Sequence, residues 1–412
     1  MSKLALLGGQ KTIVRDANSP KKGGNPESFE DAFARYVDAK YALPVSSGQT
    51  ALNAALAAAG VGPGDEVIVV SFTWLASVSC VLHNNAIPIF VDIDDETFTM
   101  DPKDVKRKIT ERTKVILPVD IYGHPAPVVE LKQIAEKNNL VLVEDAAQAT
   151  GAQINGEMVG SVAHITTFSF AGKPLSSSSG GVLTTNSQEF YERAALAGQH
   201  PSMLSQIVTT PELRKYVATG GYGDNHRPDG HALTLAYENL KTMDENTDAR
   251  IENANFLTSE LSKIPGITPP YVKPEVRHVY HMYTCLYDEN HFGVPRDKFV
   301  AALNAEGVTT WTYIDGANYV FESDGTPCHV GPLHHRTIYQ ELDLYGKGCP
   351  FQCPHGMTPK YEIGSLPVTE QVTKQEFNFL QHDLTSPNDL DMMKRYMEAI
   401  HKVIDNINEL RK

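Results

Sequence analysis

The chain has 412 residues, of which 41% are hydrophobic and 21% are charged, and it carries a formal net charge of −14. The length favours two domains, at 1–245 and 246–412, and the charge argues against nucleic acid or an anionic membrane surface as the main partner. No stretch approaches the roughly 20 apolar residues of a membrane helix, and the first apolar run is shorter than a signal-peptide core. Five scattered cysteines do not make a disulfide framework, so we expect a reduced, cytoplasmic globular protein.

The beginning of the chain supplies a possible anion site. Residues 1–40 are predicted as an extended arm followed by a helix whose aromatic side chains pack in the core. Residues 42–60 read as a short strand, a loop and an Ala/Leu helix, with Gly48, Gln49 and Thr50 where the helix begins. Free backbone N–H groups and the helix dipole favour a phosphate at such a point, although an ordinary helix cap explains the same residues equally well.

Strands and helices then alternate along the chain. Residues 62–94 read as turn, strand, helix and strand, residues 101–112 as a charged helix, residues 114–125 as a strand and loop, and residues 127–139 as a helix. Trp74 stands at the start of one helix, where its flat ring could stack on a flat cofactor, although a tryptophan is more often simply packed. The alternation predicts a parallel, right-handed α/β sheet whose ligands collect at the carboxyl ends of the strands.

Two charged residues stand out at the carboxyl ends of predicted strands. Residues 141–148, VLVEDAAQ, place Asp145 where a buried strand ends, and residues 164–186 place Lys173 in a loop between two strands. If both face one crevice, the pair suits pyridoxal phosphate: the lysine holds the aldehyde as a Schiff base and the aspartate keeps the pyridine nitrogen protonated. Taken singly, each residue is as well explained by a turn or by a solvated surface loop.

The last third of the chain no longer shows the regular alternation of predicted strands and helices. A polar helix at 246–264 is predicted to link two domains, and it is followed by a β-rich run at 278–288 and a helix at 295–307. Residues 315–364 are loop-like, and residues 387–411 form a final charged helix. This pattern predicts a smaller α+β domain that covers one side of the crevice.

A cluster of cysteines and histidines near the C-terminus raises the question of zinc. Zinc sites favour tight pairs such as C-x₂-C, and the pair here is C-x₃-C. We therefore expect no metal, and two interpretations stay open: His329, His334 or His335 lines a polar substrate pocket, or the segment is a plain surface loop. The clustered residues are Cys328, His329, His334, His335, Cys349, Cys353 and His355.

Taken together, the motifs resemble a known family. SSGQTALNAAL, GPGDEVIVVSFTWLAS, PIFVDID, YGHPA, VEDAAQA, FSF with a following lysine and GG, and GYGDNHR before a helix occur in this order. They resemble the DegT/DnrJ-type aminotransferases, pyridoxal-phosphate enzymes that aminate keto-sugars and keto-cyclitols. The segments LALLGG, HVYHMYT and GPLHHRTIYQ also resemble segments of family members, so the similarity runs over nearly the whole chain. The resemblance implies an aspartate-aminotransferase-like α/β fold (fold type I), with a mostly parallel sheet in the large domain.

The resemblance also implies roles for residues that hold the cofactor. Lys173 would form the Schiff base with pyridoxal phosphate, Asp145 would pair with the pyridine nitrogen, and Gln148 would lie near the phenolic oxygen of the ring. Trp74 would stack on the ring. The phosphate would be held by Gly48, Gln49, Thr50 and Ser169.

Two further residues would connect the site to its partners. Asn225 would reach the phosphate of the neighbouring subunit, which implies a homodimer with shared sites. Arg227 would meet the carboxylate of the amino donor or an oxygen of the substrate, and similar enzymes use glutamate or glutamine as the donor.

The sequence departs from the family pattern at three points. Only two residues, Ala171 and Gly172, separate FSF from the lysine, where the family usually has three. Ser179 replaces the acid of GEGG, and the phosphate loop reads SGQT instead of SGT. These departures leave room for a different pyridoxal-phosphate reaction, such as a dehydration, and a non-catalytic cofactor-binding regulator is the third alternative.

Overall fold

A computed structural model of the chain describes residues 28–315, 329–343, 346–349, 351–352 and 358–411. The predicted N-terminal arm up to residue 27 lies outside the described residues. So do Cys328, Cys353 and His355 of the cysteine and histidine cluster. Among the described residues, no helix is both long enough and apolar enough to cross a membrane.

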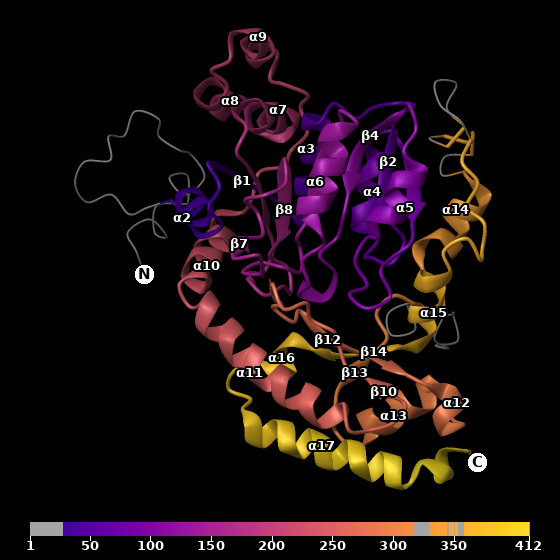
Figure 1. Cartoon of the computed structure of the whole chain (residues 1–412). Coiled ribbons are helices and arrows are strands. Elements are labelled where there is room, and N and C mark those ends of the chain that lie inside the picture. Colours follow the sequence, from indigo (N-terminus) through magenta and orange to yellow (C-terminus); the bar gives the residue numbers. More distant parts are fainter. Residues whose placement is uncertain (1–27, 316–328, 344–345, 350, 353–357, 412) are drawn as a thin grey trace.

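A seven-stranded sheet forms the centre of the N-terminal part (Figure 1). Six strands run parallel, and β9 alone runs antiparallel to both of its neighbours, so the prediction of a parallel sheet holds for all but one strand. A strand that returns directly through a loop must reverse its direction, whereas a parallel neighbour requires a crossover helix. In their order across the sheet, the strands are β1 (Tyr41–Val45), β9 (Gly181–Thr185), β8 (Ile165–Ser169), β5 (Val141–Asp145), β4 (Thr113–Leu117), β2 (Glu66–Val70) and β3 (Ile87–Val91).

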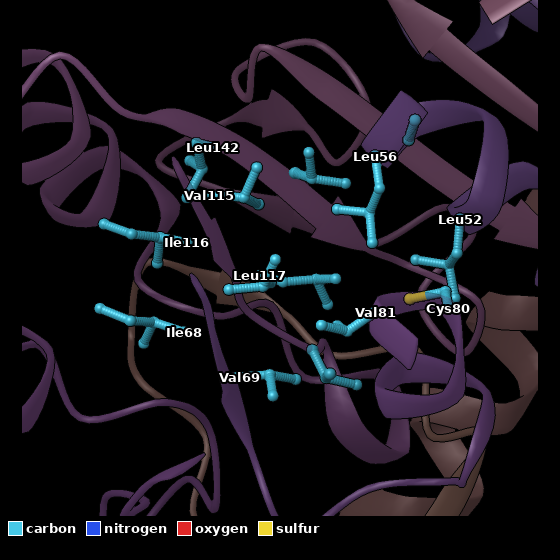
Figure 2. Packing of buried hydrophobic residues seen from close by; sticks show 14 of the residues in the cluster. Leu52, Leu56, Ile68, Val69, Cys80, Val81, Val115, Ile116, Leu117 and Leu142 are labelled. Atoms are coloured by element: carbon cyan, nitrogen blue, oxygen red, sulfur yellow. The ribbon is translucent and has the colours of Figure 1, made fainter. Parts of the chain in front are cut away.

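Helices cover the sheet and bury its side chains. Strand β2 has the sequence EVIVV and is buried at every position, as expected for a strand covered on both faces. Figure 2 shows Leu52 and Leu56 of α3 and Val81 of α4 packed with strand residues such as Val69 and Leu117. The helices of this part are α2 (Phe29–Tyr36), α3 (Gly48–Ala58), α4 (Ala76–His83), α5 (Pro102–Lys108), α6 (Val128–Lys137), α7 (Gln188–Gly198), α8 (Pro201–Ile207), α9 (Pro211–Arg214) and α10 (Gly230–Leu240), with the 3₁₀ turns η2 (Ile121–Gly123) and η3 (Val217–Thr219).

A second core surrounds a four-stranded antiparallel sheet. The long helix α11 spans the predicted domain boundary and leads down to this sheet, while α17 packs beneath it (Figure 1). The strands, in sheet order, are β10 (Ile267–Thr268), β12 (Met282–Tyr287), β14 (Glu376–Leu380) and β13 (Thr310–Trp311). The helices are α11 (Met243–Leu261), α12 (Glu289–Phe292), α13 (Arg296–Ala305), α15 (Pro367–Gln375), α16 (Gln381–Leu384) and α17 (Leu390–Asp405), and the 3₁₀ turn η5 (Ile407–Arg411) follows.

The described parts of 329–372 do not belong to that second core. Leu333, Tyr339, Phe351 and Val372 are buried in the same core as the large sheet. The interpretation of 315–364 as loop-like was wrong for part of its length, because it contains η4 (Leu333–His335) and the helix α14 (Thr337–Glu341), which runs beside the large sheet in Figure 1. The exact domain boundary stays a prediction.

Two other predicted elements need correction. The charged helix expected at 101–112 ends at Lys108, because the chain must turn there to enter β4 at Thr113. The final helix ends at Asp405 rather than at residue 411, and a 3₁₀ turn completes it. A small sheet of β11 (Val276–Arg277), β6 (Gln153–Ile154) and β7 (Glu157–Met158) was not predicted, because strands of two residues leave no periodicity in the sequence.

Candidate active site

Asp145 ends strand β5 and lies buried at the carboxyl edge of the large sheet. Its carboxylate accepts a hydrogen bond of 2.7 Å from the Ser77 hydroxyl and one of 3.1 Å from the backbone N–H of Ala147. The Ser77 hydroxyl is in turn 2.8 Å from that of Thr73. Burial raises the pKa of Asp145, and the nearby positive charge of Lys173 opposes that rise. A buried carboxylate of this kind fits a cationic ring nitrogen, because an opposite charge stabilises its ionised form.

Lys173 lies in the loop between β8 and β9 and shares this site with Asp145. Burial lowers the pKa of Lys173 to about 8, while the charge of Asp145 acts in the opposite direction. The Nζ atom lies 3.3 Å from Nε2 of His281, which stands just before β12. The structure therefore brings together the two residues that the sequence marked first. It also adds a histidine from the C-terminal part of the chain.

The start of helix α3 makes an anion cradle against the end of strand β8. Ser47 caps the helix, and its hydroxyl and the side chain of Thr50 form a reciprocal capping box. In the part of the chain that the structure describes, the backbone N–H groups of Gly48 and Gln49 have no acceptor. A Cβ on Gly48 would lie only 2.7 Å from Cβ of Ser169, so a glycine is needed where helix and strand meet. Two free N–H groups, a helix dipole and the Ser169 hydroxyl fit a phosphate.

Thr50 and Gln49 use their side chains mainly to hold the loop. The Thr50 hydroxyl accepts the backbone N–H of Ser47 at 2.9 Å and donates to the Ser47 carbonyl at 2.9 Å. Gln49 accepts a hydrogen bond of 2.9 Å from Ser79 of α4. Both readings of this loop, helix cap and anion site, are therefore compatible with its geometry, because the capping uses side chains and leaves backbone N–H groups free.

Gln148 lies at the centre of a buried polar chain. Its Oε1 accepts the backbone N–H of Tyr122 at 2.6 Å, and its Nε2 donates to the Tyr313 hydroxyl at 3.1 Å. The Tyr122 hydroxyl donates to Glu376 at 3.1 Å, and the same carboxylate accepts the backbone N–H groups of Tyr313 and Ile314 at 2.7 and 2.8 Å. This series of hydrogen bonds joins the β5 edge of the large sheet to strand β14 of the small sheet.

Trp74 is half exposed at the rim of this group, as expected for a ring that could meet a ligand. Its ring lies 6.0 Å from that of Tyr313, with 27° between the two planes. Tyr313 therefore contacts both Trp74 and Gln148, the two residues that the family resemblance places at one cofactor ring.

Asn225 and Arg227 lie on an exposed loop before α10. The Arg227 guanidinium donates to the Asn225 side chain at 3.1 Å, and between them the His226 carbonyl accepts the backbone N–H of Ser46 at 2.8 Å. The loop is thus attached beside the anion cradle, while its two predicted site residues point their polar groups at each other. Their exposure leaves them accessible to a second subunit.

The three histidines of the predicted pocket face two different groups of carboxylates, and only His334 and His335 lie together. His329 is exposed and lies near Asp297 and Asp315. His334 is buried, with Nδ1 2.7 Å from the Ser71 hydroxyl and Nε2 3.0 Å from Glu370. His335 also faces Glu370, at 3.5 Å.

Glu370 could share a metal ion with two of these histidines, because the ligand atoms of His334, His335 and Glu370 lie within 4.8 Å of one another. Both ring nitrogens of His334 already have protein partners, however, and these partners explain its burial. The absence of a metal stays a prediction.

The residues that surround the predicted ones were not apparent from the sequence. Ser77 lies within the quoted stretch FTWLAS, but a serine in a helix carries no special signal. His281 lies in HVYHMYT, where the sequence predicted only a β-rich run. Tyr313, Glu376 and Gln381 are distant in sequence from Asp145 and Lys173, and no local pattern connects them to the site.

Comparison with known proteins agrees with this site. The model of the DegT/DnrJ/EryC1/StrS aminotransferase family matches residues 11–385. The dTDP-3-amino-3,4,6-trideoxy-alpha-D-glucose transaminase of Streptomyces venezuelae is 34% identical over 323 residues, which are 78% of this chain and 78% of that protein. The putative L-glutamine:3-amino-2,3-dideoxy-scyllo-inosose aminotransferase of Micromonospora echinospora is 30% identical and covers 98% of this chain and 92% of its own length.

Solved structures show the same architecture. S. venezuelae DesV, determined in complex with a ketimine intermediate, has a TM-score of 0.73 at 29% identity and covers 98% of this chain and 95% of its own. The aminotransferase from Psychrobacter cryohalolentis has a TM-score of 0.75 at 26% identity, covering 92% and 91%. These likenesses confirm the predicted α/β fold of the fold type I aminotransferases.

Proposed function

Because the chain belongs to the DegT/DnrJ/EryC1/StrS aminotransferase family, we propose that it transfers an amino group from glutamate or glutamine to a keto-sugar or keto-cyclitol. Membership confirms the predicted resemblance, the aminotransferase activity and the dependence on pyridoxal phosphate. The names of two relatives support the proposed acceptors, since one name mentions a dTDP-linked sugar and the other an inosose. The second name also supports glutamine as the donor.

The observation that carries the proposal is the meeting of Lys173 and Asp145 in one site, where Asp145 is buried and Lys173 is partly buried in the loop that follows the neighbouring strand β8. When bound, pyridoxal phosphate supplies an electron sink that lets a proton leave Cα of the amino donor. Lys173 would accept that proton, and a pKa near 8 leaves a usable fraction of the amine unprotonated near neutral pH. Asp145, fixed by Ser77, would hold a proton on the ring nitrogen.

The remaining predicted residues would hold the cofactor. Gly48, Gln49 and Thr50 would bind the phosphate at the start of α3, with the hydroxyl of Ser169 beside them. Gln148 would lie near the phenolic oxygen of the ring, and Trp74 would stack on it. The outlying polar residues Arg227, His329 and His335 are proposed to contact donor or acceptor oxygens. His334 is left out of this proposal, because it is buried and both of its ring nitrogens already face Ser71 and Glu370.

We propose that two copies of the chain form a homodimer in which sites are shared. Asn225 is exposed on a loop attached to the backbone of Ser46, so it can reach outward from the anion cradle. Light scattering during size-exclusion chromatography would test the dimer. Mixing a Lys173→Ala chain with an Asn225→Ala chain would test the sharing, because only mixed dimers would contain one intact site and regain activity.

The central proposal can be tested with visible absorption spectra. Protein purified with pyridoxal phosphate is expected to show a cofactor band that Lys173→Ala abolishes or shifts, because the covalent cofactor–lysine bond is lost. Adding L-glutamate or L-glutamine should bleach the wild-type band. Product formation would then be followed by mass spectrometry with a panel of nucleotide-linked keto-sugars and with scyllo-inosose.

Each result separates the proposal from its alternatives. A band that depends on Lys173 and that neither donor changes would contradict the proposed donors and favour a different pyridoxal-phosphate reaction, such as dehydration. No band at all would contradict the assignment of the site. Bleaching by a donor without turnover of any acceptor would limit the conclusion to the first half of the reaction.

A further inference from the structure

A histidine and a glutamine from the C-terminal part of the chain hold the loop of Lys173. His281 stands before β12, and its Nε2 lies 3.3 Å from Nζ of Lys173. Its other ring nitrogen, Nδ1, lies 3.2 Å from Oε1 of Gln381, the first residue of α16. The amide of Gln381 in turn donates to the carbonyl of Gly172 at 3.2 Å. The contacts therefore form a continuous path from the residue before the lysine back to its amine.

The chemistry of these groups fixes the tautomer of His281. The Gly172 carbonyl can only accept, so it must face the NH₂ group of Gln381, and the oxygen of Gln381 must then face His281. An amide oxygen can only accept, so Nδ1 of His281 carries the proton. In the neutral ring, Nε2 is left with a lone pair, which is directed at the amine of Lys173.

His281 stays neutral in this position. Burial, followed by the positive charge of Lys173, holds its pKa well below the ordinary histidine value, while the bond to Gln381 acts in the opposite direction. The other charged groups that act on this pair are Arg250 of α11, which further lowers the pKa of His281, and Asp145, which raises that of Lys173. The ring is therefore available as an acceptor for an N–H group of Lys173.

We propose that His281, oriented by Gln381, is a positioning residue that accepts a hydrogen bond from Nζ of Lys173. By accepting an N–H, the ring directs the lone pair of a neutral Lys173 away from itself, and it stabilises the ammonium form once the lysine has taken up a proton. This role rests on the proposed function only in its last consequence, the proton transfer. The hydrogen bond itself belongs to the unloaded protein.

The arrangement also accounts for the unusual loop before the lysine. Only Ala171 and Gly172 separate the FSF motif from Lys173, and Gly172 adopts a positive φ of 62°, which glycine tolerates well. Gln381 anchors the carbonyl of this glycine from the C-terminal part of the chain. A loop held in this way keeps the amine in one place even though it is one residue shorter than usual.

The proposal can be tested in cofactor-free protein by the reactivity of one amine. Lys173 would be acetylated in brief pulses of acetic anhydride at pH 6 to 10, and its peptide quantified by mass spectrometry. The half-maximal rate is expected near pH 8 in the wild type. His281→Phe removes the acceptor and should move this midpoint down by about one pH unit, because the ammonium form loses a hydrogen bond. His281→Gln, which can place an amide oxygen near the lysine, should restore much of the wild-type value.

A merely structural role predicts the opposite sign. If the substitution only loosened the site, water would enter and the midpoint would rise towards that of a free lysine. A midpoint in His281→Phe that is unchanged or raised would therefore overturn the proposal. Gln381→Leu, at a partly exposed position, gives a milder second variant and should shift the midpoint in the same direction as His281→Phe by a smaller amount.

The control is another histidine of the same segment. His278 is equally buried, stacks on Tyr280 at 4.0 Å between ring centroids and, within the described residues, makes no hydrogen bond to Lys173. His278→Phe should leave the midpoint unchanged. In the loaded enzyme, His281→Phe is expected to lower kcat at least about tenfold with little change in KM for the donor, since the lost contact serves the proton-transfer step.

The two kinds of failure can be distinguished. In one case, His281→Phe lowers the midpoint of Lys173 acetylation as expected, but no donor bleaches the cofactor band of the wild type. This result would support the His281 contact and contradict the proposed function. In the other case, the wild type transaminates, but His281→Phe leaves the midpoint of Lys173 acetylation unchanged. This result would support the proposed function and contradict the role of His281.

Discussion

The two sides of the candidate site are built in different ways. On the Asp145 side, the carboxylate, Ser77, Ala147 and the start of α3 all come from the first 150 residues and share the core of the large sheet. On the Lys173 side, the amine is held by His281, and its loop is held by Gln381, which are 108 and 209 residues from their partners in the sequence. One side is local and embedded in one core, while the other depends on two parts of the chain meeting.

This difference indicates which part of the site is rigid. Asp145 sits at the end of a strand that is hydrogen-bonded on both sides and buried under helices, so its position is set when the large sheet folds. The geometry at Lys173 also depends on where β12, β14 and α16 lie. Glu376 ties these elements to the large sheet through Tyr122. Any movement of the C-terminal part is therefore expected to change the position of Lys173 more than that of Asp145.

The largest expected effect comes from the local side. Asp145→Asn keeps the shape and the partners but removes the charge that holds a proton on the cofactor ring, and it should lower kcat by about a thousandfold, or about 4 kcal/mol. The cofactor should still attach to Lys173, which absorption spectra would check. Glu144→Gln is the matched control, since this neighbour points to the opposite face of the strand and bonds Thr166. If both variants lost activity equally, the charge of Asp145 would not be the cause.

The next effect concerns the stability of the other side. Burial raises the pKa of Glu376 to about 7 in the folded protein, above its ordinary value. Between about pH 4.5 and pH 7 the unfolded chain loses this proton while the folded protein keeps it, so stability falls as the pH rises and levels off above pH 7. Glu376→Gln removes this titration and should gain about 2 kcal/mol relative to the wild type between pH 5 and pH 8.

Urea unfolding at pH 5, 6, 7 and 8 measures that difference, and its slope with pH matters more than its absolute value. Any constant cost of placing an amide at residue 376 cancels when two pH values are compared. Glu398→Gln, on the exposed face of α17, is the control and should keep the wild-type slope. Parallel curves for Glu376→Gln and the wild type would show that the buried carboxylate does not titrate in this range.

A smaller effect is expected on cofactor affinity when the anion cradle at the start of α3 is altered. Gly48→Ala would put a Cβ 2.7 Å from that of Ser169, so helix α3 must move away from β8. The affinity for pyridoxal phosphate is expected to fall about tenfold, or about 1.4 kcal/mol, in a fluorescence titration. Gly62→Ala, where an added Cβ meets nothing within 4 Å, should bind as the wild type does. Equal affinity of the two variants would remove the cradle from the binding site.

The smallest effect probes the polar chain between the two sides. Tyr313→Phe removes the acceptor for Nε2 of Gln148 and leaves a buried amide unsatisfied, which should cost about 1 kcal/mol and lower kcat/KM about fivefold. A double-mutant cycle with Gln148→Leu measures the coupling. Additive losses would show that the hydroxyl and the amide act independently.

The sequence by itself determined those features of this protein that depend on residues close together in the chain. Alternating buried strands and helices predicted the α/β sheet, and residues at the carboxyl ends of strands predicted Asp145 and Lys173, because both features depend on periodicity and on neighbours within one element. The motif order gave the family and its cofactor. The anion cradle at Gly48 was visible for the same reason, since a helix start is a property of a few consecutive residues.

Only the tertiary structure decided what surrounds Lys173. His281, Tyr313, Glu376 and Gln381 reach the site through the meeting of two cores, and no spacing in the sequence records that meeting. The packing of α14 against the large sheet was hidden for the same reason. Long-range contacts depend on how whole elements dock, whereas periodicity reports only which face of an element is buried.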